Sequence, residues 1–317
     1  MTRAAGVFLQ VLFRRTTRNF FHPEQGGDQG FRRLRLGDKD SADNMVNRLS
    51  IGVLVAACLA GVGALFSVAA TGQATDTATE RGLAIAREAD RRDRGFGDQV
   101  AELTMTLTNR NGGISRRKLR ISTLEVDRKG FGDKTLVVFD TPRDVKGVAL
   151  LSYARVLEPD DQWLYLPALK RIKRISSVNK SGAFVGSEFS YEDMAPPEVE
   201  KYTYRFLRDA PCGADTCFVL EQTPRYKYSG YSHLIAWLDH RHYRIRRIDY
   251  FDRRQAPLKT LTTGGWRQYL GKYWRAHDLL MENHRTGKTT RLQWSEFRFK
   301  TGLGETNFSR NSLKRGR

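Results

Sequence analysis

The stretch Ala101-Glu-Leu-Thr-Met-Thr-Leu107 decides the fold class of this 317-residue chain. Its apolar residues occupy the odd positions and its polar residues the even positions, which is the period of a β-strand with one buried face. Asn109-Arg-Asn-Gly-Gly113 follows directly, and asparagine next to glycine is typical of a hairpin turn. We therefore predict an antiparallel hairpin whose first strand turns Leu103, Met105 and Leu107 toward a core.

The second strand of this hairpin, Arg117–Val126, changes face part of the way along. Leu119 and Ile121 share one face, whereas Leu124 and Val126 fall on the other. Such a slip predicts a β-bulge within the strand.

The period of two continues to the C-terminal end of the chain. Turn residues separate short apolar runs, which indicates an antiparallel sheet that winds continuously, with one apolar and one charged face. Asp193–Glu198, which contains two consecutive prolines, is the predicted crossover loop. The further predicted strands are Thr135–Phe139, Val148–Leu151, Trp163–Leu166, Tyr202–Leu207, Cys217–Gln222, Leu234–Leu238, Arg244–Phe251, Trp266–Leu270, Leu279–His284 and Leu292–Phe299.

A single good helix, Thr75 to Arg94, precedes these strands and ends at Gly95-Phe-Gly97. One helix cannot cover the apolar face of about ten strands, so the sheet must curl toward itself, and a barrel of that size can enclose a cavity. The sequence therefore predicts a mainly β domain over residues 75–317. We expect an incomplete antiparallel β-barrel with an N-terminal helix and a hollow suited to acyl chains.

Residues 45–74 have the composition of a secretory signal peptide. Met45-Val-Asn-Arg48 is a short basic segment, Ile51–Ala70 contains no charged residue, and Val68-x-Ala70 and Gly72-x-Ala74 are candidate cleavage sites. This interpretation predicts that the domain after residue 74 is exported.

Residues 1–44 show no apolar periodicity, and a signal peptide does not need such a long leader. We predict that they are a disordered or spurious extension and that translation starts at Met45. Two alternatives remain for residues 45–74. The apolar run is long enough to be an uncleaved membrane anchor, and Val55-Ala-Ala-Cys58 resembles a lipobox.

Cys212 and Cys217 lie close together in a turn-rich loop between two predicted strands. Such a pair can form a disulfide in an oxidising compartment. Their four-residue spacer does not match the CxxC redox motif, and nothing nearby supplies further zinc ligands. Two unrelated thiols remain the alternative.

The chain is strongly basic, with a formal charge of +19. Residues 71–317 hold 45 Lys and Arg against 30 Asp and Glu, which favours an anionic membrane surface or an acidic protein as partner. An exported protein rarely meets nucleic acid, so we expect no nucleic-acid partner. A merely solvated basic surface is the alternative, because the arginines are spread along the chain.

Complete catalytic motifs are absent from the sequence. Gly230-Tyr-Ser-His-Leu234 lacks the last glycine of a nucleophile elbow, and Thr286-Gly-Lys-Thr289 lacks the leading glycine of a P-loop. His240-Arg-His242 places two imidazoles near each other, but flanking arginines oppose a cation. We expect a monomeric protein that is not an enzyme and needs no cofactor or metal.

Two segments combine aromatic, glycine and basic residues. Gln162–Ile175 places a short strand with Trp163 and Tyr165 on one face before a basic run, and Phe184–Asp193 is rich in aromatic side chains. We predict an apolar lining flanked by a basic rim that meets an anionic head group. The candidate lipid-binding residues are Leu103, Met105, Leu107, Leu119, Ile121, Trp163, Tyr165, Phe184, Phe189 and Tyr191, and the candidate head-group or partner-binding residues are Lys170, Arg171, Lys173 and Arg174.

These two segments, together with Arg91–Asp98 and Lys146–Leu151, resemble the outer membrane lipoprotein-sorting protein family, which is related to the periplasmic carriers LolA and LolB. The resemblance spans roughly residues 80–310. It implies a LolA/LolB-like incomplete barrel, with helices over its mouth, that carries acyl chains in the periplasm without catalysis.

We therefore predict a periplasmic carrier that binds the acyl chains of a lipid or lipoprotein for transfer toward the outer membrane. The alternative, which the resemblance also implies, is a non-enzymatic adaptor of an inner-membrane transporter of the resistance–nodulation–division type. An exported hydrolase is a third reading, and the absence of a credible nucleophile and base opposes it.

Overall fold

The computed structural model describes residues 70–315. The predicted extension and residues 45–69 of the predicted signal segment lie outside the described residues. Within the described part, no helix is both long and apolar enough to cross a bilayer.

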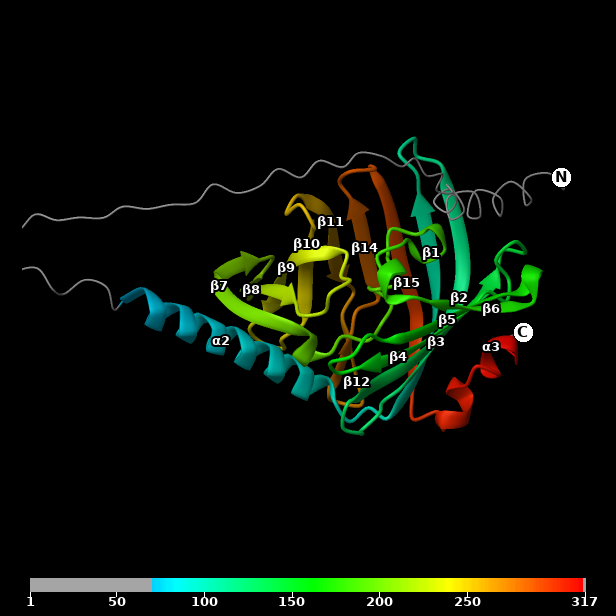
Figure 1. The fold of residues 1–317 in the computed structure, drawn as a ribbon, viewed down its shortest axis with the longest axis horizontal. Helices are drawn as coiled ribbons and strands as arrows, with labels where there is room; N and C mark the ends of the chain where they lie inside the picture. Colours follow the sequence, from blue (N-terminus) through cyan, green and yellow to red (C-terminus); the bar gives the residue numbers. More distant parts are fainter. Residues whose placement is uncertain (1–69, 316–317) are drawn as a thin grey trace, which may run out of the picture. The chain divides into compact units, whose positions relative to one another are not determined.

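The predicted N-terminal helix is present as α2, Ala70–Asp93. It packs along the edge strand β7 (Figure 1). Gly82 permits this close approach, because a Cβ at that position would lie 2.8 Å from the backbone nitrogen of Phe206. Ile85 and Ala86 of the helix are buried. The helix ends before Gly95, whose φ of +97° favours glycine.

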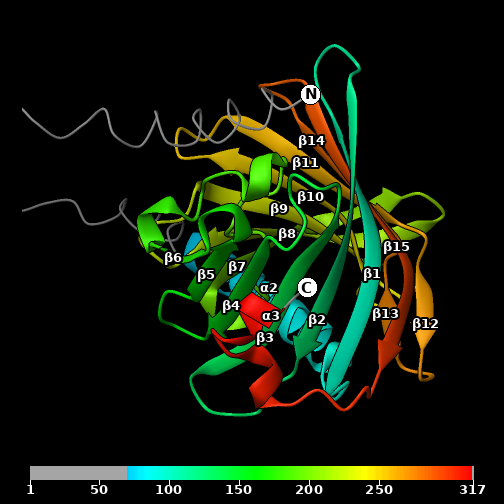
Figure 2. The same ribbon diagram turned by 90° about the vertical axis from the view of Figure 1, so that its right-hand side faces the viewer.

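A 13-stranded antiparallel sheet forms the body of the fold, and its two edge strands, β6 and β7, do not pair with each other. The prediction of a mainly β protein with an antiparallel sheet and an N-terminal helix is confirmed, and the sheet curls without closing (Figures 1 and 2). In spatial order, the strands are β6 (Arg171–Ile175), β5 (Asp161–Leu166), β4 (Ala149–Arg155), β3 (Phe131–Thr141), β2 (Ile114–Leu124), β1 (Asp98–Thr108), β15 (Lys288–Phe299), β14 (Asp278–Asn283), β11 (Pro257–Gly264), β10 (Ile245–Asp252), β9 (Tyr231–Asp239), β8 (Asp215–Pro224) and β7 (Tyr202–Cys212).

Smaller elements complete the domain. β12 (Arg267–Tyr269) and β13 (Tyr273–Arg275) form a separate two-stranded sheet. The C-terminal segment contains the 3-10 helix η5 (Glu305–Phe308) and the short helix α3 (Ser312–Arg315). The 3-10 helix η1 (Pro167–Leu169) lies between β5 and β6. The connection from β6 to β7 contains three more, η2 (Ser177–Asn179), η3 (Phe184–Gly186) and η4 (Val199–Lys201).

The bulge predicted in the second strand is wrong in its position. β1 and β2 pair without interruption from Asp98↔Leu124 to Thr108↔Ile114, and β2 shifts register only against β3, between Lys118 and Leu119. The change of face at Leu124 has a different cause, because that residue packs in a cluster on the opposite face of the sheet. At this position, both faces of the sheet are covered by other parts of the chain.

Three strands were not predicted. β6 has two apolar residues among three cations, of which Ile175 joins the inner cluster and Ile172 the outer one, and β13 has only three residues. β11 carries Lys259 and Thr260 at buried positions, which hides its apolar alternation. Polar residues that are buried with partners do not follow the pattern from which strands are predicted.

Two apolar clusters lie on opposite faces of the sheet. The inner cluster faces the connection between β6 and β7, and its buried members include Leu103, Met105, Leu119 and Leu150. A third cluster joins Ile85 of α2 to Leu220, Ala236 and Leu238 of the sheet. The outer cluster, which includes Val138, Leu151 and Tyr165, is covered by Phe308 and Leu313 of the C-terminal segment. The face that the sequence pattern assigned to solvent is therefore partly a second core.

Residues 176–201 connect the two edge strands, and we call them the crossover segment. They contain the predicted crossover loop Asp193–Glu198, which is confirmed by the strand order. Phe184 of this segment is fully buried in the inner cluster, with its ring 5.7 Å from that of Phe139. The crossover segment thereby fills one half of the inner face.

Candidate ligand cavity

A cavity of about 1290 Å³ remains over the other half of the inner face. Its walls come from α2, from the inner faces of β7–β11, from residues 125–133 and from the end of the crossover segment. Sites for drug-sized ligands occupy about 300–1,000 Å³, so this cavity has room for a larger molecule.

The wall that faces α2 is apolar. The side chains that form it share the alternation of β8–β11, in which every second residue points inward. They are Leu220, Leu234, Leu238, Ile245, Ile248 and Leu261, and Ala86 and Ala89 of α2 also line the cavity. These side chains contain no polar groups, so a hydrocarbon bound against them would leave no hydrogen-bonding group unpaired.

Buried tyrosines form a second part of the lining. Tyr202, Tyr226, Tyr231 and Tyr250 line the cavity, and burial raises the pKa of each phenol above its usual value of 10. The four hydroxyls are therefore neutral at physiological pH. They present apolar rings and a few hydrogen-bonding groups to the cavity.

Two carboxylates, the buried Glu198 and the half-buried Asp133, lie at the end of the cavity formed by residues 125–133 and 195–202. Desolvation raises the pKa of Asp133 from 3.8 to about 6, and it raises that of Glu198 from 4.5 to about 7. The negative charge of Asp133 raises the pKa of Glu198 further, and those of Glu125 and Asp93 raise the pKa of Asp133. This end of the cavity therefore changes its charge near neutral pH.

Buried ion pairs hold the crossover segment in place. Asp160 contacts the ammonium groups of both Lys180 and Lys201, and all three side chains are less than 10% exposed. Lys259 of β11 lies 2.5 Å from Asp193 and also donates to the carbonyl of Glu188. These contacts fix the boundary between the filled and the hollow half of the inner face.

Eight of the ten predicted lipid-binding residues lie in or against the inner cluster, five of them on β1 and β2 and three in the crossover segment itself. They are Leu103, Met105, Leu107, Leu119, Ile121, Phe184, Phe189 and Tyr191. The structure brings these residues together, but none of them lines the cavity. Trp163 and Tyr165 lie on the opposite face of the sheet, in the outer cluster.

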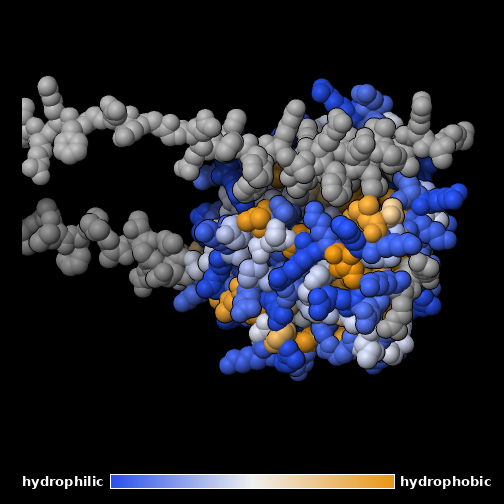
Figure 3. All heavy atoms as spheres, turned by 45° about the vertical axis from the view of Figure 1, so that its right-hand side comes forward, coloured by the Kyte–Doolittle hydropathy of each residue, from blue (hydrophilic) through white to orange (hydrophobic). Residues whose placement is uncertain are grey.

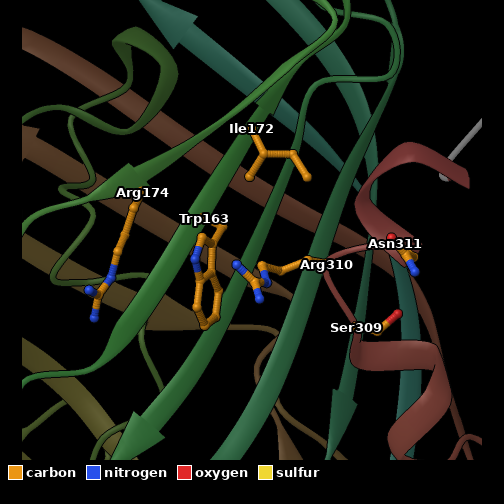
Figure 4. A pocket seen from close by; sticks show the side chains of 6 residues that line it. All are labelled: Trp163, Ile172, Arg174, Ser309, Arg310 and Asn311. Carbon is orange, nitrogen blue, oxygen red and sulfur yellow. The ribbon is translucent and has the colours of Figure 1, made fainter.

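The predicted basic rim lies on the edge strand β6 and in the turn before it. Lys170, Arg171, Lys173 and Arg174 are exposed, and none of them lines the large cavity. Arg174 instead borders a smaller pocket of about 570 Å³ with Trp163, Ile172 and residues 309–311 (Figure 4). The face shown in Figure 3 is mostly hydrophilic, with apolar residues in small separate patches.

Other predicted features have the following positions. Cys212 and Cys217 form a disulfide across the turn between β7 and β8. His240 contacts Asp209, whereas the ring of His242 lies against Trp274. Among residues 70–315, no group of three or more His, Cys, Asp or Glu side chains could hold a metal ion.

Sequence reasoning missed the residues that line the cavity. The strands β8–β10 were predicted, and the spacing of Leu234, Ala236 and Leu238 was visible in the sequence. No local pattern in the sequence indicates that the crossover segment fills one half of the inner face and leaves the other half open. Glu198, which follows two prolines, carried no recognisable signal.

The sequence and the fold of this chain are similar to those of known proteins. A family model described as an uncharacterized protein matches residues 132–315, and no curated protein matches the chain. An outer membrane lipoprotein-sorting protein domain from Vibrio parahaemolyticus is 52% identical, with a TM-score of 0.72, over 74% of this chain and 99% of that one. A DUF1329 family protein from Desulfovibrio piger is 28% identical, with a TM-score of 0.71, over 74% and 99%.

A LolA superfamily protein from Nitrosomonas europaea shares the fold, with a TM-score of 0.60 and 17% identity over 73% of this chain and 98% of that one. An unclosed antiparallel sheet with a helix on its inner face thus defines a LolA-like fold. At the level of sequence, the chain belongs to the outer membrane lipoprotein-sorting protein family. The family predicted from residues 162–193 is confirmed.

Proposed function

We propose that this protein is a periplasmic carrier that binds acyl chains of a lipid or lipoprotein between α2 and strands β8–β11, for transfer toward the outer membrane. The cavity of about 1290 Å³, with apolar side chains from α2 and β8–β11 in its lining, carries this proposal. Membership of the lipoprotein-sorting family supports it. The disulfide is consistent with an oxidising compartment such as the periplasm.

The energetics favour hydrocarbon as the occupant. Removing one methylene from water contributes about 0.8 kcal/mol, so ten methylenes contribute about 8 kcal/mol before the cost of ordering the chain. Carriage of this kind requires no bond to be broken, and we propose no catalytic residue. The function is to shield an apolar ligand from water.

The acyl-binding surface in this proposal differs from the residues expected from the sequence. The eight candidates of the inner cluster already pack against the crossover segment. None of them lines the cavity. Lys170, Arg171, Lys173 and Arg174 remain candidates for contact with an anionic membrane surface.

A fluorescent fatty-acid binding assay with two tryptophan variants of α2 tests the proposal. Ala89 lines the cavity, whereas Ala84 on the same helix is exposed. Ala89→Trp should occupy acyl-chain volume and weaken binding at least about tenfold, the equivalent of two methylenes. Ala84→Trp should bind as the wild type does. Equal binding by both variants would place the acyl chain elsewhere.

A role as adaptor of an inner-membrane transporter is the second candidate, and the exposed basic edge strand β6 favours it. This strand has one unpaired edge and carries Arg171, Lys173 and Arg174. An exposed strand edge can accept a strand from another protein. Co-purification of an inner-membrane transporter with lipid-free protein, lost when these three cations are replaced by Glu, would support the adaptor role.

A further inference from the structure

Glu198 is a buried carboxylate without a partner of its own. The residue is only 7% exposed and lines the cavity. Among the described residues, its carboxylate makes neither a hydrogen bond nor an ion pair. Gly132 makes room for it, because a Cβ at that position would lie 1.7 Å from Oε1 of Glu198. The glycine at position 132 therefore leaves space for a carboxylate that has no counterion of its own.

The neighbouring cations already serve other carboxylates. Lys201 contacts Asp160, and Nε of Arg94 lies 2.7 Å from Oδ2 of Asp90. Asp133 accepts one hydrogen bond, from the backbone N–H of Val126 at 3.1 Å. Two acids thus share this end of the cavity without a dedicated positive charge, and an uncompensated buried charge is unfavourable.

We infer that the cavity selects a lipid whose head group carries an ammonium group, and that Glu198, with Asp133 beside it, binds this cation. The inference rests on the proposed function, because it assumes that the apolar wall holds the acyl chains of the same molecule. An ammonium group offers three hydrogen-bond donors. It would supply the counterion that the polypeptide lacks at this position.

Binding of such a ligand depends on pH. Burial raises the pKa of Glu198 to about 7 and that of Asp133 to about 6, and only the ionised forms attract a cation. The charged groups that face Glu198 are Asp133 of β3, Asp90 of α2, Arg94 directly after α2, and Lys201 of η4. Asp133 additionally faces Glu125 and Asp93. Affinity for an ammonium lipid should therefore fall as the pH is lowered from about 8 to about 5.5.

The test compares two lipids that differ only at the amine. Delipidated protein is titrated with phosphatidylethanolamine and with its N-acetylated derivative, which has the same acyl chains and no ammonium charge. Displacement of a fluorescent fatty acid is measured at pH 8 and at pH 5.5. A charge-assisted hydrogen bond corresponds to about a tenfold to hundredfold preference. We expect this preference for the free amine at pH 8 and its loss at pH 5.5.

Two variants locate the effect. Glu198→Gln keeps the shape of the side chain and should abolish the preference while both lipids still bind. Glu282→Gln, at an exposed position of β14, should keep it. If Glu198→Gln does not fold, the pH series on the wild-type protein decides the question.

The possible failures are distinguishable. Equal affinity of wild-type protein for both lipids at pH 8 would overturn the inference and leave the proposed function intact. Binding of neither lipid would overturn the proposed function. Ethanolamine alone, added as a third ligand, should not compete below millimolar concentration. Competition by ethanolamine at the concentration of the lipid would show that the site serves a soluble amine, which also overturns the inference.

Discussion

Replacing Asp160 by Asn should strongly destabilise the protein. The Asp160 side chain is 9% exposed and holds Lys180 and Lys201, which are themselves 6% and 8% exposed. Asn has the same shape but no charge, so two buried ammonium groups would lose their counterion. Breaking a buried ion pair by removing one partner costs about 3–5 kcal/mol. We expect Asp160→Asn to lower the free energy of unfolding by that amount.

Urea unfolding followed by circular dichroism at pH 7 measures this effect. Asp278→Asn is the matched control, because Asp278 pairs with Arg291 at the surface, where the side chains are 32% and 49% exposed. A surface pair contributes about 0–1 kcal/mol. If Asp160→Asn cost no more than Asp278→Asn, the buried ion pairs would not be what fastens the crossover segment.

Three further predictions concern close packing and titration. Gly82→Ala should destabilise the protein by about 1–3 kcal/mol in urea unfolding, because the new Cβ meets the backbone of Phe206; an unchanged midpoint would contradict the close contact of α2 with β7. Gly132→Ala should lower the free energy of unfolding by a similar amount, because the new Cβ meets the Glu198 side chain. The loss should be smaller when Glu198 is also replaced by Ala. Strictly additive effects in this double-mutant cycle would show that the two residues do not touch. Because burial raises the pKa of Glu198 from 4.5 to about 7, native lipid-free protein binds a proton that the unfolded chain has lost, and stability should fall by up to about 3 kcal/mol as the pH rises through this window. Glu198→Gln should flatten that pH profile, whereas Glu282→Gln should leave it unchanged.

The strand content and the antiparallel class were predictable because alternation is a local property. The alternation of apolar and polar residues over 101–107 is enough to predict the buried face of this strand, and the hairpin turn after it predicts its partner strand. β11 escaped prediction because its inward Lys259 is satisfied by Asp193, which lies 66 residues earlier in the chain. A buried charge with a distant partner has no local signature.

The position of the cavity was not predictable for a related reason. The inner-facing residues of β1–β4 and those of β8–β10 have the same apolar pattern. What distinguishes them is the element that covers each half. Phe184 and Phe189 fill the first half, whereas α2 stands over the second and leaves a hollow. The candidate residues were therefore apolar and inward-facing, but they lie on the filled side.

Crosslinking with a photoactivatable fatty acid tests the location of the acyl chain most directly. Bound probe is irradiated, the protein is digested, and the labelled residues are identified by mass spectrometry. We predict labels on Ala89, Leu238 and Ile248, which line the cavity. Labels confined to Leu103 and Met105, beneath the crossover segment, or no specific label, would contradict a carrier that holds its ligand between α2 and the sheet.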